Sequence, residues 1–186
     1  MVAAWLDAGV RLIQIRAKSL PFGPFLELAA PMAQACRAAG AVFIVNDRAD
    51  VARLVRASGV HVGQEDLSPS EALTVIPDAE WIGLSTHSEA QLEAALTTPA
   101  TYVAMGPVFG TTTKARPDPT IGLDAIARAA RRLEGTGRPL VAIGGIDLDR
   151  APATIAAGAQ SVAVISDLIA GDDVAARARA FLRALA

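Results

Sequence analysis

The sequence predicts an α/β fold, a (β/α)8 TIM barrel that lacks its first strand. Seven short apolar runs alternate with stretches of helical periodicity over the 186 residues, which is typical of parallel strands joined by helical crossovers. The runs begin at intervals of roughly 20 residues, as successive strands of a barrel do. Nearly every run turns polar or glycine-rich at its carboxyl end, where barrels of this kind carry their active sites.

The candidate elements follow one another without a linker, so we expect a single domain over residues 1–186. The expected strands are 10–16, 42–45, 60–62, 81–84, 102–105, 140–143 and 161–165. The expected helices are 1–8, 25–39, 50–57, 69–75, 88–96, 123–133, 151–157 and a terminal Ala- and Arg-rich helix. Ser68 and Ser88 are placed to cap two of these helices.

The chain opens on a helix, so the strand that is missing from the count of eight should have come first. A truncated start, a start codon that lies upstream, or another segment filling the gap would each explain the count. An open doubly wound sheet is the competing architecture, but the glycine-rich turn expected after its first strand is absent.

Composition excludes several classes of protein. A net charge of −2 without basic clusters argues against nucleic-acid binding. No apolar run approaches the roughly 18–20 residues of a membrane span, and no secretory signal is visible, so we expect a soluble chain. The single cysteine, Cys36, lies in an Ala-rich helical segment, where a small core residue and a cytoplasmic location are the default expectations.

The stretch Gly106–Lys114 has the composition of a phosphate-binding loop. Its glycines and proline force the backbone to turn and expose N–H groups, and three hydroxyls and an ammonium follow. A polar surface loop is the plain alternative. Fifteen of the seventeen basic residues are arginine, so the only two lysines, Lys18 and Lys114, are candidates for phosphate contacts.

Other strand ends carry groups that suit polyanions and metals. Gln14, Arg16 and Lys18 share one face of their strand and could clamp a polyanion. Asp47 and Asp66 follow neighbouring strands, and Mg²⁺ is commonly held by one or two carboxylates plus substrate phosphates. N-capping is the simpler role for both aspartates.

The last strands end in bare amides and a hydroxyl. Gly144, Gly145 and Ser166 form the kind of phosphate site that barrels build after their final strands. His61 and His87 stay ambiguous between packing, capping and substrate contact. No zinc-ligand spacing and no nucleophile–His–Asp arrangement is legible.

Taken together, these motifs resemble thiamine-phosphate synthase. The matching segments, in order and over essentially the whole chain, are QIRAK at 14–18, NDRAD at 46–50, GVHVGQEDL at 59–67, GLSTHS at 83–88, GPVFGTTTK at 106–114, Gly122, AIGGI at 142–146 and VAVIS at 162–166. The resemblance implies a transferase that joins hydroxymethylpyrimidine pyrophosphate to hydroxyethylthiazole phosphate, giving thiamine phosphate and pyrophosphate, with Mg²⁺ as cofactor. In the family the pyrophosphate is thought to leave before the thiazole nitrogen attacks.

The resemblance also implies residue roles. The implied pyrophosphate ligands are Gln14, Arg16, Lys18, Asn46, Ser85 and Lys114, of which Arg16, Lys18, Ser85 and Lys114 are the expected catalytic residues. The implied Mg²⁺ ligands are Asp47 and Asp66. The implied thiazole-phosphate pocket is Thr111, Thr113, Gly145, Val164, Ile165 and Ser166. The expected partners are small molecules, with neither nucleic acid nor membrane, and homo-oligomerisation is left open.

Three alternatives remain. A thiazole tautomerase-like relative would share the barrel, but such relatives tend to lose the Asn-Asp pair and the TxTK loop, which are both intact here. A non-catalytic ligand-binding barrel would be expected to lose its buried charges. An unrelated phosphate-binding isomerase would give Asp47 and Asp66 no role. Without its first strand, the chain is expected to show poor solubility or low turnover.

Overall fold

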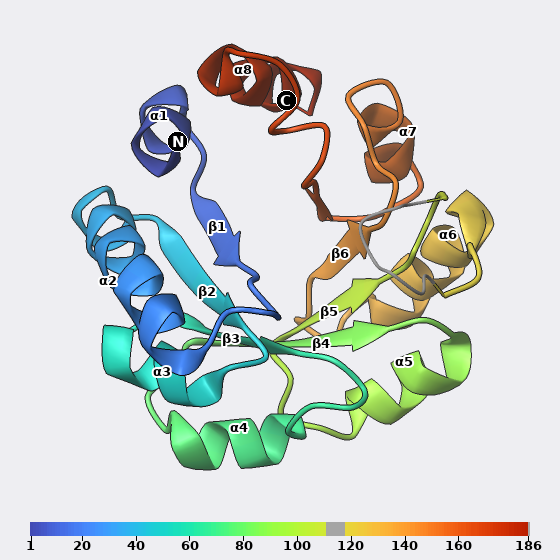
Figure 1. The fold of residues 1–186 in the computed structure, drawn as a ribbon. Helices are drawn as coiled ribbons and strands as arrows, with labels where there is room; N and C mark the ends of the chain where they lie inside the picture. The colour runs from blue at the N-terminus through green and yellow to red at the C-terminus, as the bar shows by residue number, and fades with distance from the viewer. Residues whose placement is uncertain (111–117, 186) are drawn as a thin grey trace.

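Seven parallel strands, in chain order β1 to β7, form one curled sheet with the helices on its outer side (Figure 1). The computed structural model describes residues 1–110 and 118–185. The strands are β1 (Leu12–Ile15), β2 (Val42–Asn46), β3 (Gly59–Val62), β4 (Trp81–Thr86), β5 (Tyr102–Met105), β6 (Leu140–Ile143) and β7 (Ser161–Ala163). The helices are α1 (Val2–Ala8), α2 (Phe22–Ala38), α3 (Ala49–Val55), α4 (Pro69–Val75), α5 (Glu89–Leu96), α6 (Gly122–Leu133), α7 (Ala151–Ala156) and α8 (Val174–Ala184).

The sheet is a barrel that stays open along one side, as the seven-strand count predicts. Among the described residues, no strand pairs with the free edge of β1 or of β7. Helices α1 and α8 pack against each other outside this opening, so both ends of the chain lie beside it (Figure 1). The prediction of a TIM-barrel-like fold with one strand missing is therefore confirmed.

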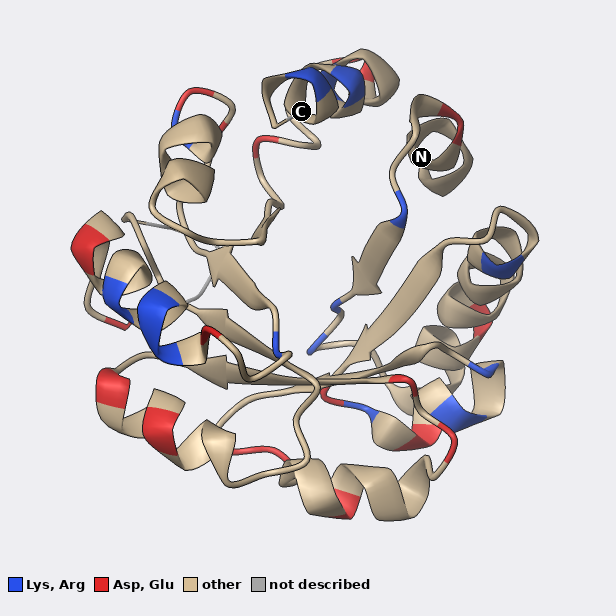
Figure 2. Cartoon of the chain, turned by 180° about the vertical axis from the view of Figure 1, so that it is seen from behind, with Lys and Arg blue, Asp and Glu red and all other residues tan. Residues whose placement is uncertain are grey.

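The strands carry no charged residue, and the charges lie on the helices and connections (Figure 2). Apolar side chains on the outer face of the sheet pack against the helices and form the main core, as Phe43, Val45 and Val103 do. Cys36 is fully buried in this core, as predicted. Within the described part of the chain, no helix combines the length and apolar character needed to cross a bilayer.

Both predicted serine caps are present. The Ser68 hydroxyl accepts a hydrogen bond from the Glu71 amide, and the Glu71 carboxylate accepts one from the Ser68 amide, which forms a capping box on α4. Ser88 caps α5 by accepting a hydrogen bond from the amide of Gln91.

Most element boundaries differ from the predicted ones by one or more residues, and three of these differences have a clear structural cause. Helix α2 begins at Phe22 rather than residue 25, because Pro24 falls in the first turn, where a missing N–H breaks no helical hydrogen bond. Strand β4 extends to Thr86 because its pairing with β5 continues to that residue. Strand β7 ends at Ala163 rather than residue 165, because its only pairing, with β6, ends there.

Candidate functional site

The polar residues of the candidate site gather at the carboxyl ends of the strands. Parallel pairing places Asn46 beside His61, and His61 beside Gly83, so the ends of β2, β3 and β4 lie at one edge of the sheet. Asn46 is buried at this edge. The exposed residues Gln14 and Arg16 lie at the neighbouring end of β1. The edge therefore combines an amide, a guanidinium and an imidazole.

Asp47 is the centre of a small charged cluster at this edge. It follows β2 in a left-handed conformation with φ 64°, which aspartate tolerates better than most residues. Its amide donates to the His61 carbonyl over 2.8 Å, so the backbone of β3 fixes its place. The Lys18 ammonium lies 3.1 Å from its Oδ2, and its carboxyl group lies close enough to that of Asp66 to form a hydrogen bond when it is protonated.

Burial and the neighbouring carboxylate raise the pKa of Asp47. Desolvation has the largest effect, followed by the hydrogen bond to Asp66, and the Lys18 ammonium opposes both by lowering the pKa. The Asp66 carboxylate itself accepts a hydrogen bond of 2.8 Å from the Gly63 amide, which holds it at the end of β3. Two carboxylates this close repel each other when both are ionised, so the pair is suited to binding a cation.

The donor set of Asp47 and Asp66 fits a hard divalent cation such as Mg²⁺. Two carboxylates close enough to share a hydrogen bond can both approach one ion, which would remove their mutual repulsion. The described residues contain no group of three or more His, Cys, Asp or Glu side chains that could hold a metal. An ion held here would therefore take its remaining ligands from water or from a bound anion, as Mg²⁺ commonly does.

His61 is the centre of a second, neutral cluster inside the curled sheet. Its Nδ1 lies 2.9 Å from the Tyr102 hydroxyl and its Nε2 lies 2.8 Å from the Ser85 hydroxyl. Burial lowers the pKa of His61 to about 4 against a smaller opposing effect of Asp66, so the ring is neutral at physiological pH. Burial likewise raises the pKa of Tyr102, and an interaction with the Gln14 side chain opposes this by lowering it.

Gly83 makes room for this cluster. A Cβ at Gly83 would lie less than 3.0 Å from both the Tyr102 ring and the His61 Nδ1. The missing side chain lets the two rings approach within hydrogen-bonding distance across β4. The sequence left the role of His61 open and did not place Tyr102 or Gly83 in the site, because a histidine between two valines in a short strand can face either side of the sheet.

The glycine turn after β6 lies against the segment that follows β5. Gly145 has φ 65°, and a Cβ there would lie within 2.8 Å of the Phe109 carbonyl group. The amide of Phe109 donates to the Gly144 carbonyl over 3.0 Å, and Arg150 donates to the Gly145 carbonyl over 2.9 Å. Arg150 also lies over the Phe109 ring, 4.9 Å from its centroid. Backbone amides can therefore face an anion at a turn that is held from both sides.

The predicted pocket residues Val164, Ile165 and Ser166 lie in the connection after β7. Val164 is half-buried, whereas Ile165 and Ser166 are exposed. The Asp167 carboxylate accepts a hydrogen bond of 2.8 Å from the Leu148 amide and ties this connection to the one that follows β6. The two halves of the expected phosphate pocket are thus linked.

Three predicted site residues, Thr111, Thr113 and Lys114, lie outside the described residues. At the start of that connection, the Gly106 carbonyl oxygen lies 2.6 Å from the His87 Nδ1. The His87 Nε2 lies 3.5 Å from the Asp118 carboxylate. His87 thus contacts residues near both ends of the β5–α6 connection.

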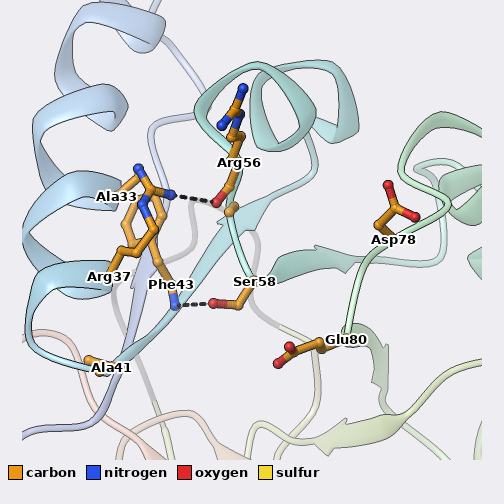
Figure 3. A pocket seen from close by; sticks show the side chains of 10 residues that line it. Ala33, Arg37, Ala41, Phe43, Arg56, Ser58, Asp78 and Glu80 are labelled. Carbon is orange, nitrogen blue, oxygen red and sulfur yellow. Dashed lines mark hydrogen bonds between the residues drawn. The ribbon is translucent and has the colours of Figure 1, made fainter.

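A cavity of about 320 Å³ lies at the opposite, amino-terminal ends of the strands. Figure 3 shows Arg37 and Arg56 on one side of it and Asp78 and Glu80 on the other. The Arg37 guanidinium donates to the Arg56 carbonyl over 3.0 Å, so part of the polar lining supports the backbone. None of the predicted site residues lines this cavity, and barrels of this kind carry their active sites at the other end.

Comparisons with known proteins agree with this arrangement. A sequence model of the thiamine monophosphate synthase family matches residues 1–168. A thiamine-phosphate synthase from Synechococcus is 46% identical over 97% of the chain, and a bifunctional thiamine biosynthesis protein from Symbiobacterium thermophilum is 43% identical over 98%. The chain spans 50% of the length of the first of these relatives and 37% of the second.

A solved structure is similar over nearly the whole chain. The thiamine phosphate pyrophosphorylase from Pyrococcus furiosus superposes with a TM-score of 0.89 at 32% identity, covering 99% of this chain and 87% of that one. The match of the family model and this structural likeness both extend over the strand ends described above. The chain therefore belongs to the thiamine monophosphate synthase family.

Proposed function

We propose that this chain catalyses the joining of a hydroxymethylpyrimidine pyrophosphate to a hydroxyethylthiazole phosphate, releasing pyrophosphate. The observation that carries the proposal is the cluster of Asp47, Asp66 and Lys18 at the carboxyl edge of the sheet, where Ser85 also lies. This edge offers cations and a paired carboxylate site to a pyrophosphate. The glycine turn at Gly144 and Gly145 offers backbone amides to a second, separate phosphate.

The reaction requires two bonds to change. The C–O bond between the pyrimidine methylene group and the pyrophosphate breaks, and the leaving pyrophosphate takes the electron pair. The lone pair of the thiazole ring nitrogen then forms a C–N bond to the same carbon and gives a thiazolium. No proton has to be transferred, so the demand on the protein is charge neutralisation and positioning.

The side chains at this edge meet that demand. Lys18 and Arg16 provide positive charge for the leaving group, and the Ser85 hydroxyl provides a hydrogen bond. When bound between Asp47 and Asp66, Mg²⁺ would supply further charge stabilisation to the pyrophosphate oxygens. Lys114, by its place in the sequence motif, is proposed as another ligand of the same anion. Asn46, buried beside Asp47, is proposed to hold an oxygen of the substrate.

A coupling assay tests the proposal. The protein is mixed with the pyrimidine pyrophosphate, the thiazole phosphate and Mg²⁺, and pyrophosphate release is followed with and without the thiazole. Release that depends on thiazole and Mg²⁺, and is lost in Asp47→Ala and in Lys114→Ala, is the expected result. Asp50→Asn is the matched control, because this exposed carboxylate near Asp47 pairs with Arg48 and lies outside the proposed site.

Retained folding of each variant is checked by circular dichroism. A folded wild-type protein that releases no pyrophosphate from the two substrates would overturn the proposal. Isomerisation of a thiazole substrate in its place would favour the tautomerase-like alternative, and binding without turnover would favour the ligand-binding barrel.

A further inference from the structure

We propose that His61 is a positioning residue that acts through Ser85: a hydrogen-bond chain from Tyr102 through His61 turns the Ser85 hydroxyl proton toward the bound pyrophosphate. This inference rests on the proposed function, since it assigns a direction to one contact with the leaving group. The chain of groups runs from Tyr102 on β5 to His61 on β3 and then to Ser85 on β4, and each link is a separate side-chain hydrogen bond.

The surroundings leave His61 only these hydroxyl partners. Its side chain is 5% exposed and Tyr102 is 6% exposed, so water does not compete for the ring nitrogens. The two rings lie 5.5 Å apart between centroids with an angle of 37° between their planes. Both imidazole nitrogens are occupied by hydroxyl groups at 2.8–2.9 Å, as a neutral buried ring requires.

The direction of the chain follows from the Tyr102 hydroxyl. Its hydrogen bond runs to the His61 Nδ1 over 2.9 Å, and the proton of a buried hydroxyl requires an acceptor. Tyr102 keeps its proton, because burial disfavours the phenolate, and that proton then points to the His61 Nδ1. A neutral ring that accepts at Nδ1 carries its proton on Nε2 and donates it to the Ser85 oxygen.

The consequence falls on Ser85. A serine hydroxyl has one proton, and an anion can only accept hydrogen bonds. The orientation of the hydroxyl group therefore decides whether it attracts or repels a pyrophosphate oxygen. With His61 donating to its oxygen, Ser85 retains its proton for the anion. The opposite tautomer would draw that proton toward Nε2 and point a lone pair at the ligand. The Ser85 carbonyl accepts a hydrogen bond of 2.6 Å from the Gln64 amide, which also fixes the backbone.

The first test reads the tautomer directly. The chain contains two histidines, so a two-dimensional ¹⁵N–¹H NMR spectrum of histidine-labelled protein has two sets of ring signals, and a His87→Gln sample assigns them. We expect His61 to carry its proton on Nε2 in the wild type near neutral pH. A proton on Nδ1, or a charged ring, would overturn the proposed direction regardless of whether the protein turns over substrate.

The second test asks whether Tyr102 and His61 act through Ser85. Binding of inorganic pyrophosphate with Mg²⁺ is measured by calorimetry for Ser85→Ala, Tyr102→Phe and the double variant. We expect Ser85→Ala to weaken binding by roughly 10- to 100-fold, the range for a hydrogen bond to a charged group, and Tyr102→Phe to weaken it by a smaller factor. In the double variant, the loss should equal that of Ser85→Ala alone, because Tyr102 then has no hydroxyl to orient.

Trp81→Phe is the matched control, because this ring packs edge-on against Tyr102, with 6.2 Å between centroids, and makes none of the hydrogen bonds in the chain. It should bind pyrophosphate like the wild type. Losses that add in the double variant, with the wild type binding normally, would overturn the relay and leave the proposed function intact. A wild-type protein that fails to bind pyrophosphate would overturn both, while the NMR result would still decide the tautomer.

Discussion

Replacing Gly83 by alanine tests the packing on which the inner cluster depends. The new Cβ would lie less than 3.0 Å from the Tyr102 ring and from the His61 Nδ1, a distance that real Cβ atoms essentially never show. Both rings are buried between strands, so neither can swing into solvent. The substitution must therefore push the rings apart and break the hydrogen bond between them.

Two costs add to give the expected effect. Overpacking a well-packed interior costs roughly 1–3 kcal/mol, and a buried donor or acceptor left without its partner costs roughly another 1–3 kcal/mol. The free energy of unfolding should fall by about 2–6 kcal/mol, which lowers Tm by roughly 5–20 °C for a chain of this size. Thermal and urea unfolding followed by circular dichroism measure both quantities.

Gly23→Ala is the matched control for this substitution. Gly23 lies in the first turn of α2, and a Cβ there meets nothing within 4 Å, so alanine should stabilise the protein by roughly 0.4–1 kcal/mol. A Gly83→Ala protein as stable as the wild type would refute the reasoning, because it would show that the rings can separate without cost.

Three further predictions concern charge and the open sheet. Asp47→Asn should raise the midpoint of urea unfolding of the metal-free protein at pH 7 but not near pH 3. The reason is that a carboxyl group with a raised pKa stabilises the fold at low pH and loses that contribution as the pH rises. The same variant should bind pyrophosphate with Mg²⁺ at least roughly 30-fold more weakly than the wild type. His61 has its pKa lowered to about 4, so lowering the pH from 7 to 4.5 should reduce the free energy of unfolding by roughly 2–3 kcal/mol more in the wild type than in His61→Gln. Equal losses in urea titrations of the two proteins would contradict this. Adding a strand upstream of α1 that pairs in parallel with the free edges of β1 and β7 should raise Tm and the rate of turnover. Unchanged values of both would contradict the expectation that such a strand supports stability and activity.

The order and kind of the elements could be predicted from the sequence because each strand is a short apolar run that ends in polar or glycine residues. Ser68 and Ser88 could be predicted as helix caps from the local sequence, because each serine bonds to the amide of the residue three positions later. The proximity of Asp47 and Asp66 followed from their places after neighbouring parallel strands. These are all properties of one element or of adjacent elements.

The inner cluster could not be predicted in the same way. All residues of β3 are buried, so no alternation of polar and apolar positions shows which way His61 faces. Its partner Tyr102 lies 41 residues further along the chain and comes into contact only because Gly83 leaves space between them. The end of β7 was also missed, because an edge strand stops where its single neighbour stops, which the strand's own composition does not record.

The contact between the turn after β6 and the segment after β5 has a consequence for how this chain can vary in length. The amides of Val108 and Phe109 donate to the carbonyls of Ile143 and Gly144 over 2.9 and 3.0 Å, and Gly145 has no room for a side chain. Loops ordinarily accept insertions and deletions at little thermodynamic cost. Here one added residue would shift two connections at once, so related chains should keep the spacing from Gly106 to Phe109 and from Ile143 to Gly145 fixed while other surface connections change in length.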